Sequence, residues 1–173
     1  MAEVSAVVTI RAAATSDLEV AAAIYNEGIE DRVATFETTP RTASDLEAWL
    51  QEEGPFLVAE LDGAVAGFAR VAPYSDRCVY EGVGEHAVYV ARISRGTGLG
   101  IQLLREMTAA AETAGFYKLT TRVFTDNEAS LAAHYRAGFE RVGVQRRHGK
   151  LEGEWKDCVL IEILLGEAKE ADR

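Results

Sequence analysis

Residues 85–115 decide the fold, and they read EHAVYVARISRGTGLGIQLLREMTAAAETAG. Residues 87–90 have the β-branched and aromatic content of a buried strand. From Leu99 onward, apolar side chains recur at helical spacing as far as Gly115, a residue type that commonly follows the end of a helix. Between strand and helix stands Arg95-Gly96-Thr97-Gly98-Leu99-Gly100. The stretch therefore predicts a strand, a glycine-rich turn and an amphipathic helix in direct succession.

The glycine-rich turn predicts a seat for a phosphate group. Glycines let a backbone approach its ligand without interference from Cβ atoms, and a helix start directs unpaired N–H groups and a partial positive charge at that ligand. Two other phosphate motifs do not fit, because the spacing is G-x-G-x-G rather than G-x-G-x-x-G and no Lys-Ser or Lys-Thr follows as a P-loop requires. A turn that merely links strand to helix is the alternative interpretation.

Length and charge limit the classes of protein that the sequence can encode. A chain of 173 residues, 48% of them hydrophobic, predicts a single domain over residues 1–173 with a core at about 7–165. The net charge of −10 argues against a nucleic-acid surface, although a local basic pocket remains compatible with it. With no signal peptide or apolar run of membrane-spanning length, and with only Cys78 and Cys158, we expect a cytoplasmic protein with free thiols and no membrane contact. The three histidines lack regular ligand spacing, so no metal is expected.

The remaining elements follow from local patterns. Strands are predicted over residues 7–10, 56–61, 65–71, 118–124, 139–145 and 157–164, with a hairpin turn at Asp62-Gly63. Helices are predicted over residues 18–24, after Pro40 with a cap near residues 42–44, and over residues 129–137. Irregular structure is predicted over residues 25–38, 73–84 and 148–155, with frayed or loose ends at residues 1–6 and from 167 onward.

The motif R-G-x-G-L-G resembles the pyrophosphate-binding signature of the GCN5-related N-acetyltransferases, written Q/R-x-x-G-x-G/A, and the order of elements matches their fold. The resemblance implies an α/β (α+β) domain with a mixed, twisted sheet and helices on both faces. It also implies acetyl-CoA as co-substrate. The cofactor-binding residues that it implies are Val88, Tyr89, Val90, Arg95, Gly96, Thr97, Gly98, Leu99, Gly100, Asn127 and Ser130.

Other segments are similar to the phosphinothricin acetyltransferases; these are residues 24–26, 34–38 and 73–74, Arg77, Tyr80, Glu85 and residues 88–90. Residues 147–151, with Gly153, Trp155 and Asp157, resemble the branch associated with arsinothricin resistance. That family acetylates the α-amine of glutamate-like amino acids whose side chain ends in a phosphinate or an arsinate. The resemblance therefore implies a small amino-acid substrate and a homodimer.

The chemistry needs a base and a donor for the leaving thiolate. An α-ammonium group titrates at about pH 8, so a group must remove its proton near neutral pH. Glu85 stands at the entry to the central strand and matches the family's general base; a solvated strand-end glutamate is the alternative. His134 stands four residues before Gly138, where many relatives place the thiol partner, and Tyr135 is the second choice. We expect His86, on the opposite strand face from Glu85, to be structural.

An acceptor with two anionic ends calls for arginine. Arg77 matches a family arginine, and Arg70 and Arg122 are further candidates. Phe36 and Tyr80 are predicted pocket walls, whereas Ser75 and Asp76 stand where some relatives carry another cation, which leaves the preferred anion open. Methionine sulfoximine, methionine sulfone and a protein N-terminus are alternative acceptors. A non-catalytic acetyl-CoA-binding module is the alternative from another class, and the presence of Glu85 and Arg77 counts against it.

Overall fold

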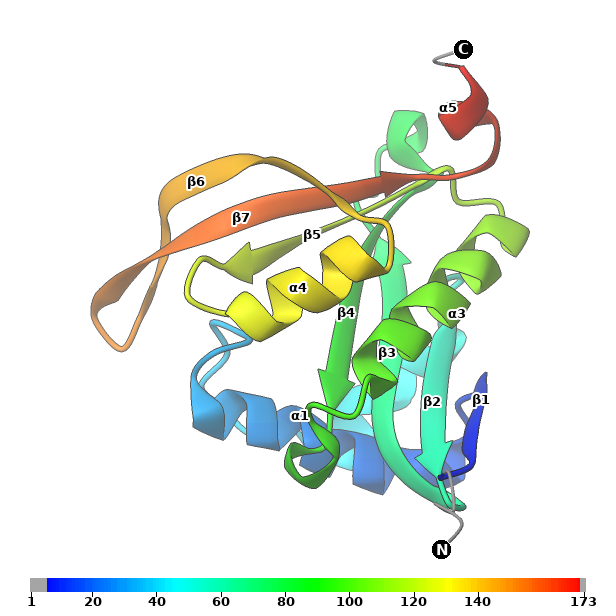
Figure 1. Ribbon diagram of the computed structural model, residues 1–173, viewed down its shortest axis with the longest axis vertical. Coiled ribbons are helices and arrows are strands. Elements are labelled where there is room, and N and C mark those ends of the chain that lie inside the picture. The colour runs from blue at the N-terminus through cyan, green and yellow to red at the C-terminus, as the bar shows by residue number, and fades with distance from the viewer. Residues whose placement is uncertain (1–5, 172–173) are drawn as a thin grey trace, which may run out of the picture.

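The computed structural model describes residues 6–171, which form one seven-stranded sheet in the order β1-β2-β3-β4-β5-β7-β6 (Figure 1). The strands are β1 (Val8–Ala12), β2 (Phe56–Leu61), β3 (Ala64–Pro73), β4 (Val83–Val90), β5 (Lys118–Phe124), β6 (Glu140–Leu151) and β7 (Glu154–Leu164). The helices are α1 (Leu18–Asp31), α2 (Ala43–Leu46), α3 (Leu99–Thr113), α4 (Glu128–Arg136) and α5 (Gly166–Glu170). Only β4 and β5 pair in parallel, and the other neighbours are antiparallel.

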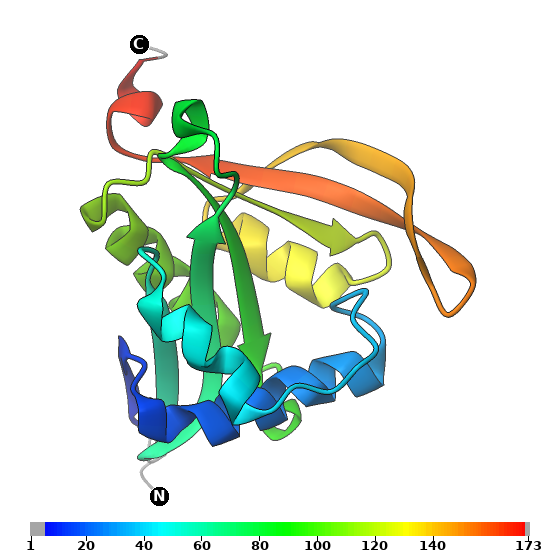
Figure 2. The same ribbon diagram turned by 180° about the vertical axis from the view of Figure 1, so that it is seen from behind.

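Helices cover both faces of the sheet, as predicted. On one face, α3 and α4 bury an apolar cluster that includes Leu103, Leu104 and Met107 against the strands. On the other face, α1 and α2 pack over Val58 and Phe68, and Figure 2 shows this side. The α3 side and the α1 side, as we call these faces below, are thus two separate layers of core divided by the sheet.

The strands β4 and β5 diverge soon after they begin. They pair only where Val83, Gly84 and Glu85 lie beside Lys118, Leu119 and Thr120. Beyond that point β4 continues downward in Figure 1 while β5 turns toward the side, so residues 86–90 of β4 have no β5 partner. Within the described chain, the backbone N–H and C=O groups of residues 86–90 that face β5 therefore form no ladder with that strand.

Two helical predictions need correction. Helix α1 runs to Asp31 instead of ending near residue 24, because Tyr25, Gly28 and Ile29 continue its buried stripe between polar neighbours. It ends at Arg32 in the left-handed conformation, with φ 56°, and the irregular segment is accordingly shorter than predicted. At the other end of the chain, residues 166–170 form the short helix α5 where we expected a loose tail. The predicted fraying of residues 1–5 lies outside the described residues.

Two strand predictions also change. Strand β4 begins at Val83, so Glu85 lies inside the strand rather than at its entry. The predicted loop over residues 148–155 is instead the tip of a long β6–β7 hairpin, closed by Glu152-Gly153 with φ values of 50° and 86°. The Asp62-Gly63 turn is confirmed by φ values of 51° and 85°, which suit a two-residue hairpin.

Candidate active site

The glycine turn leads from β4 into the start of α3. Gly96 and Gly98 have φ values of 78° and 85°, a conformation that side-chain-bearing residues rarely adopt. A Cβ atom built on either glycine would meet nothing within 4 Å, so the space above the turn is open. Because α3 begins at Leu99, the N–H groups of its first turn have no partner inside the helix. The turn therefore fits a phosphate ligand in both shape and charge.

Arginine side chains fasten this turn to the end of α1. Arg92 and Arg95 both form ion pairs with Asp31, and Arg95 Nε donates to the Val90 carbonyl at 3.2 Å. Hydrogen bonds from Arg92 first, and from Arg95 second, hold the pKa of the Asp31 carboxyl below its usual value. The Arg95 guanidinium thus lies against α1. The groups of the turn that face an anion are therefore its backbone N–H groups.

Glu85 lies on the last rung where β4 and β5 pair, between Ala72 of β3 and Thr120 of β5. Side chains alternate along a strand, and Tyr89 packs on Tyr25 of α1, so Glu85 projects on the α1 side. Its side chain is 47% exposed. The carboxylate is therefore accessible at the point where the two strands separate.

Two residues that the sequence did not bring together with Glu85 extend a polar cluster from this carboxylate, Arg122 directly and Gln145 through Arg122. The Nη1 atom of Arg122 on β5 lies 3.6 Å from Glu85 Oε1. The Nε atom of Arg122 donates to Gln145 Oε1 on β6 at 2.9 Å. Glu85, Arg122 and Gln145 thus form a polar row across the α1 side of the sheet.

On the α3 side, His86 and His134 form a buried imidazole pair with 3.1 Å between their Nε2 atoms. His134 Nδ1 lies 2.7 Å from the Ser130 carbonyl, which only accepts, so Nδ1 carries the proton. The neutral His134 ring then accepts at Nε2, and His86 Nε2 donates to it. His86 Nδ1 has no hydrogen-bond partner among residues 6–171.

Burial is the main cause that lowers the pKa of both imidazoles, and for His86 the neighbouring His134 adds to it. The Thr120 backbone acts in the opposite direction and raises the pKa of His86, although it forms no hydrogen bond with Nδ1. Both rings are therefore neutral at pH 7. His134 uses both ring nitrogens in this arrangement, whereas Tyr135 is 42% exposed, and the thiol-partner role of either residue stays a prediction.

Asn127 joins α4 to the segment between α1 and α2, residues 33–42. Its side chain accepts from the Ser130 N–H at 3.2 Å and so caps α4, while its Nδ2 donates to the Val33 carbonyl at 2.9 Å. Phe36 in the same segment packs edge-on against Phe124 of β5 with 4.8 Å between the ring centres. A Cβ atom at Gly149 of β6 would lie 2.8 Å from the Phe36 ring, so only glycine fits there unless the ring moves.

The predicted substrate arginines of β3 and the β3–β4 loop differ in what surrounds their charge. Arg70 is paired with Glu52 and stacks over the Trp49 ring at 4.1 Å, so its charge is already engaged. Arg77 is exposed, and its guanidinium lies 5.5 Å from the centre of the exposed Tyr80 ring. Of these residues, Arg77 is the cation that remains open to an anionic ligand.

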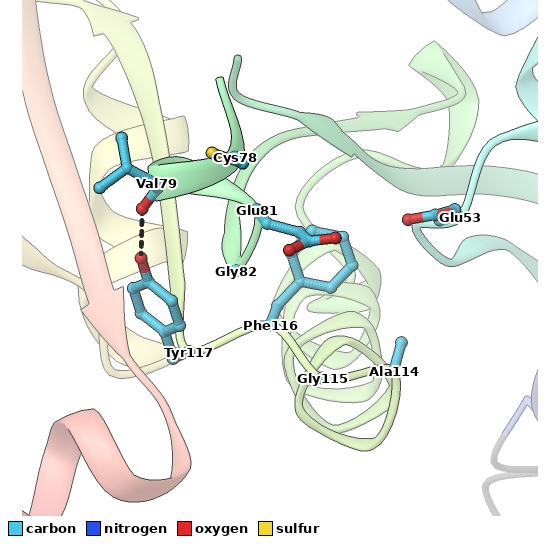
Figure 3. A pocket seen from close by; sticks show the side chains of 9 residues that line it. All are labelled: Glu53, Cys78, Val79, Glu81, Gly82, Ala114, Gly115, Phe116 and Tyr117. Atoms are coloured by element: carbon cyan, nitrogen blue, oxygen red, sulfur yellow. Dashed lines mark hydrogen bonds between the residues drawn. The ribbon is translucent and has the colours of Figure 1, made fainter. Parts of the chain in front are cut away.

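A cavity of about 450 Å³ lies beside this loop, at the C-terminal end of α3. Figure 3 shows its lining, in which the Tyr117 hydroxyl points at the Val79 carbonyl. Neither Glu85 nor the glycine turn lines it, and the carboxylates of Glu53 and Glu81 do. An acidic cavity away from the glycine turn suits neither acetyl-CoA nor an anionic acceptor, so we do not assign the site to it.

Two further properties concern the described chain as a whole. Between residues 6 and 171, no cluster of three or more His, Cys, Asp and Glu side chains is arranged to hold a metal ion. No helix in the same range has the length and apolarity needed to cross a membrane.

Comparison with known proteins gives consistent results. Residues 21–139 match the model of the acetyltransferase (GNAT) family. The chain is 32% identical to an L-methionine sulfoximine/L-methionine sulfone acetyltransferase of Pseudomonas paraeruginosa, over 94% of this chain and 98% of that protein. It is 34% identical to a phosphinothricin N-acetyltransferase of Streptomyces viridochromogenes, over 87% and 84% of the two chains.

A similar solved structure is a GNAT superfamily phosphinothricin acetyltransferase from Sinorhizobium meliloti in complex with AcCoA. It superposes with a TM-score of 0.87 at 29% identity, over 94% of this chain and 91% of that chain.

Proposed function

The chain belongs to the acetyltransferase (GNAT) family and is an N-acetyltransferase that uses acetyl-CoA, and from this premise we propose that it acetylates the α-amine of a glutamate-like amino acid. The proposed acceptors are phosphinothricin and arsinothricin, with methionine sulfoximine and methionine sulfone as the second candidates. The names of two relatives, a phosphinothricin and a methionine sulfoximine/sulfone acetyltransferase, favour this class. The proposed role is detoxification of such analogues.

The observation that carries the proposal is the half-exposed Glu85 carboxylate on the last β4–β5 rung, on the strand that leads into the glycine turn. An amine attacks a thioester carbon only as the free base, and an α-ammonium group holds its proton up to about pH 8. A carboxylate within hydrogen-bond reach can accept that proton as the nitrogen forms its bond. We assign this role to Glu85.

The glycine turn fits the phosphates of the co-substrate, because its backbone N–H groups face open space where a Cβ atom would otherwise stand. We propose that residues 96–100 hold the phosphates. We propose further that the free edge of β4 over Val88, Tyr89 and Val90, together with Asn127 and Ser130, holds the rest of the molecule. When bound, acetyl-CoA supplies the activated acetyl group as a thioester.

The donor for the departing thiolate is proposed to come from α4. To act as the donor, His134 would have to exchange its bond with His86 for one to sulfur and also gain a proton on Nε2, because its Nδ1 proton is held by the Ser130 carbonyl and Nε2 accepts from His86. The exposed hydroxyl of Tyr135 needs no such exchange. We keep His134 as the first candidate on the family resemblance and Tyr135 as the second.

The acceptor is proposed to be held by Arg77 at one of its anionic ends, with Phe36 and Tyr80 as apolar walls. Arg70 is the less suitable cation because Glu52 already neutralises it. We further propose a homodimer in the cytoplasm, on the same resemblance. A protein N-terminus is the alternative acceptor.

A thiol-release assay with acetyl-CoA tests the proposal. The acceptor panel consists of phosphinothricin, arsinothricin, methionine sulfoximine, methionine sulfone, glutamate and a short peptide with a free N-terminus. We expect acceptor-dependent thiol release with at least one of the four analogues, together with an acetylated α-amine in the product by mass spectrometry. Release with the peptide alone would contradict the proposal and support the alternative.

A further inference from the structure

Arg122 is the cation nearest to the proposed base. Its Nη1 atom lies 3.6 Å from Glu85 Oε1, and its side chain is 29% exposed. Arg122 lies two residues from Thr120, the β5 partner of Glu85, and two residues from Phe124, whose ring packs on Phe36. Residues two apart on a strand share a face, so Arg122 projects on the α1 side together with Glu85. A molecule that reaches the Glu85 carboxylate therefore also meets the Arg122 guanidinium.

Most hydrogen-bonding capacity of Arg122 is unused. A guanidinium has five N–H donors in a planar fork. Nε uses one of them for Gln145 Oε1 at 2.9 Å, whereas the 3.6 Å separation from Glu85 is longer than a hydrogen bond. No other acceptor for Arg122 stands within hydrogen-bond distance among residues 6–171. By contrast, Glu52 binds Arg70 and Asp31 binds Arg95.

Gln145 fixes the direction in which these free donors point. It reaches over β7 from β6, and its amide oxygen binds the Nε end of the fork. That bond leaves the two terminal nitrogens, which are the ones that grip a carboxylate in a bidentate pair. The Arg122 side chain is thus held in place beside Glu85 with its outer edge free.

We propose that Arg122 binds the α-carboxylate of the acceptor and that Gln145 is a positioning residue for Arg122. The inference rests on the proposed function, in which Glu85 removes a proton from the acceptor amine. In an α-amino acid, amine and carboxylate are attached to the same carbon, so an amine at Glu85 brings its carboxylate into the immediate neighbourhood. Without a cation there, the two carboxylates would repel each other.

Arg122 would then be the residue that selects free amino acids. A simple amine lacks the carboxylate, and the first residue of a peptide carries an uncharged amide in its place. Neither can form a charge-assisted bidentate pair with the guanidinium. The assignment leaves Arg77 for the anion at the other end of the acceptor side chain.

The test compares an accepted analogue with its own α-carboxamide, for instance methionine sulfone and methionine sulfone amide. The quantity measured is the ratio of the two kcat/KM values in wild type, Arg122→Gln, Gln145→Leu and the control Arg105→Gln. Arg105 is exposed and donates to the Arg136 carbonyl on the α3 side. Because each ratio is compared between proteins, the different basicity of the two amines cancels.

We expect the ratio of acid to amide to fall about 10- to 100-fold in Arg122→Gln, as befits the loss of a charge-assisted pair. Gln145→Leu should lower it by a smaller factor, and Arg105→Gln should leave it unchanged. The KM for acetyl-CoA and the thermal midpoint should stay near wild type in Arg122→Gln, which confirms that the variant is folded.

Three results would overturn the inference, and they differ from failure of the proposed function. An unchanged ratio in Arg122→Gln, with both kcat/KM values near wild type, would show that the α-carboxylate binds elsewhere. An unchanged ratio with an equal fall in both kcat/KM values would show that Arg122 acts on Glu85 alone, and a wild-type ratio in Gln145→Leu would remove Gln145 from the assignment. If wild type acetylates no amino acid in the panel, the proposed function itself fails.

Discussion

Replacing His86 by Gln should flatten the dependence of stability on pH. His86 and His134 are each 2% exposed, and burial keeps both neutral in the fold. A glutamine amide can still donate toward His134 Nε2, but it does not titrate. His86→Gln therefore removes one proton-binding site while it preserves a hydrogen bond across the pair.

The magnitude follows from proton linkage. Both folded pKa values lie below the ordinary value of 6.5, so below about pH 6.5 the unfolded chain binds protons that the folded chain does not. The stability from each neutral imidazole is complete above that pH and is lost as pH falls toward its folded pKa. Each group contributes a slope of up to about 1.4 kcal/mol per pH unit. As pH falls, the free energy of unfolding should therefore decrease by up to about 2.8 kcal/mol per pH unit in wild type and by up to about 1.4 kcal/mol per pH unit in His86→Gln.

Urea unfolding at pH 7.5, 6.5, 6.0 and 5.5 measures the free energy of unfolding in both proteins. Carboxylates that titrate in this range contribute equally to the two curves, so the difference in slope isolates His86. The control is His148→Gln, because His148 is exposed and should leave the wild-type slope intact. Equal slopes for wild type and His86→Gln below pH 6.5 would refute the neutral buried pair.

Two further predictions concern the ligand sites. Gly98→Val forces a β-branched residue to a φ of 85°, which costs on the order of 1–2 kcal/mol and displaces the turn, so calorimetry should show CoA binding at least about 10-fold weaker. The control is Gly143→Val, at a glycine with ordinary φ and open space, and this variant should bind CoA normally. Wild-type affinity for CoA in Gly98→Val would contradict the assignment of the turn as the phosphate site. Arg77→Ala should raise the acceptor KM far more than the acetyl-CoA KM, and equal effects on the two constants would contradict its assignment to the acceptor.

Much of the fold could be predicted because its signals are local. Strand β5 and the Asp62-Gly63 turn are set by neighbouring residues, and both match the prediction to the residue. The end of α1 was missed because Asn26, Glu27 and Glu30 conceal the buried stripe that Tyr25 and Ile29 continue. The β6–β7 hairpin tip was missed because its polar, exposed residues resemble a loop while the chain pairs across Glu152-Gly153.

The site could be predicted only in part. Glu85 and the glycine turn lie within one stretch, residues 85–100, and the family resemblance points to both. The contact between Arg122 and Gln145 depends on how β5, β7 and β6 pair in register. No single stretch of sequence determines that register. The His86–His134 pair joins residues 48 positions apart, and nothing in the sequence distinguishes it from two separate histidines.

The pH–rate profile of Glu85→Gln tests the central claim most directly, since glutamine keeps the size of the side chain and cannot accept a proton. Glu81→Gln, which changes an exposed loop carboxylate outside the proposed site, is the matched control. If Glu85 is the base, kcat/KM should fall on the order of 10²–10⁴-fold near pH 7 and recover in part at high pH, where solution supplies the neutral amine. A near-wild-type rate with the wild-type profile in Glu85→Gln would contradict the account.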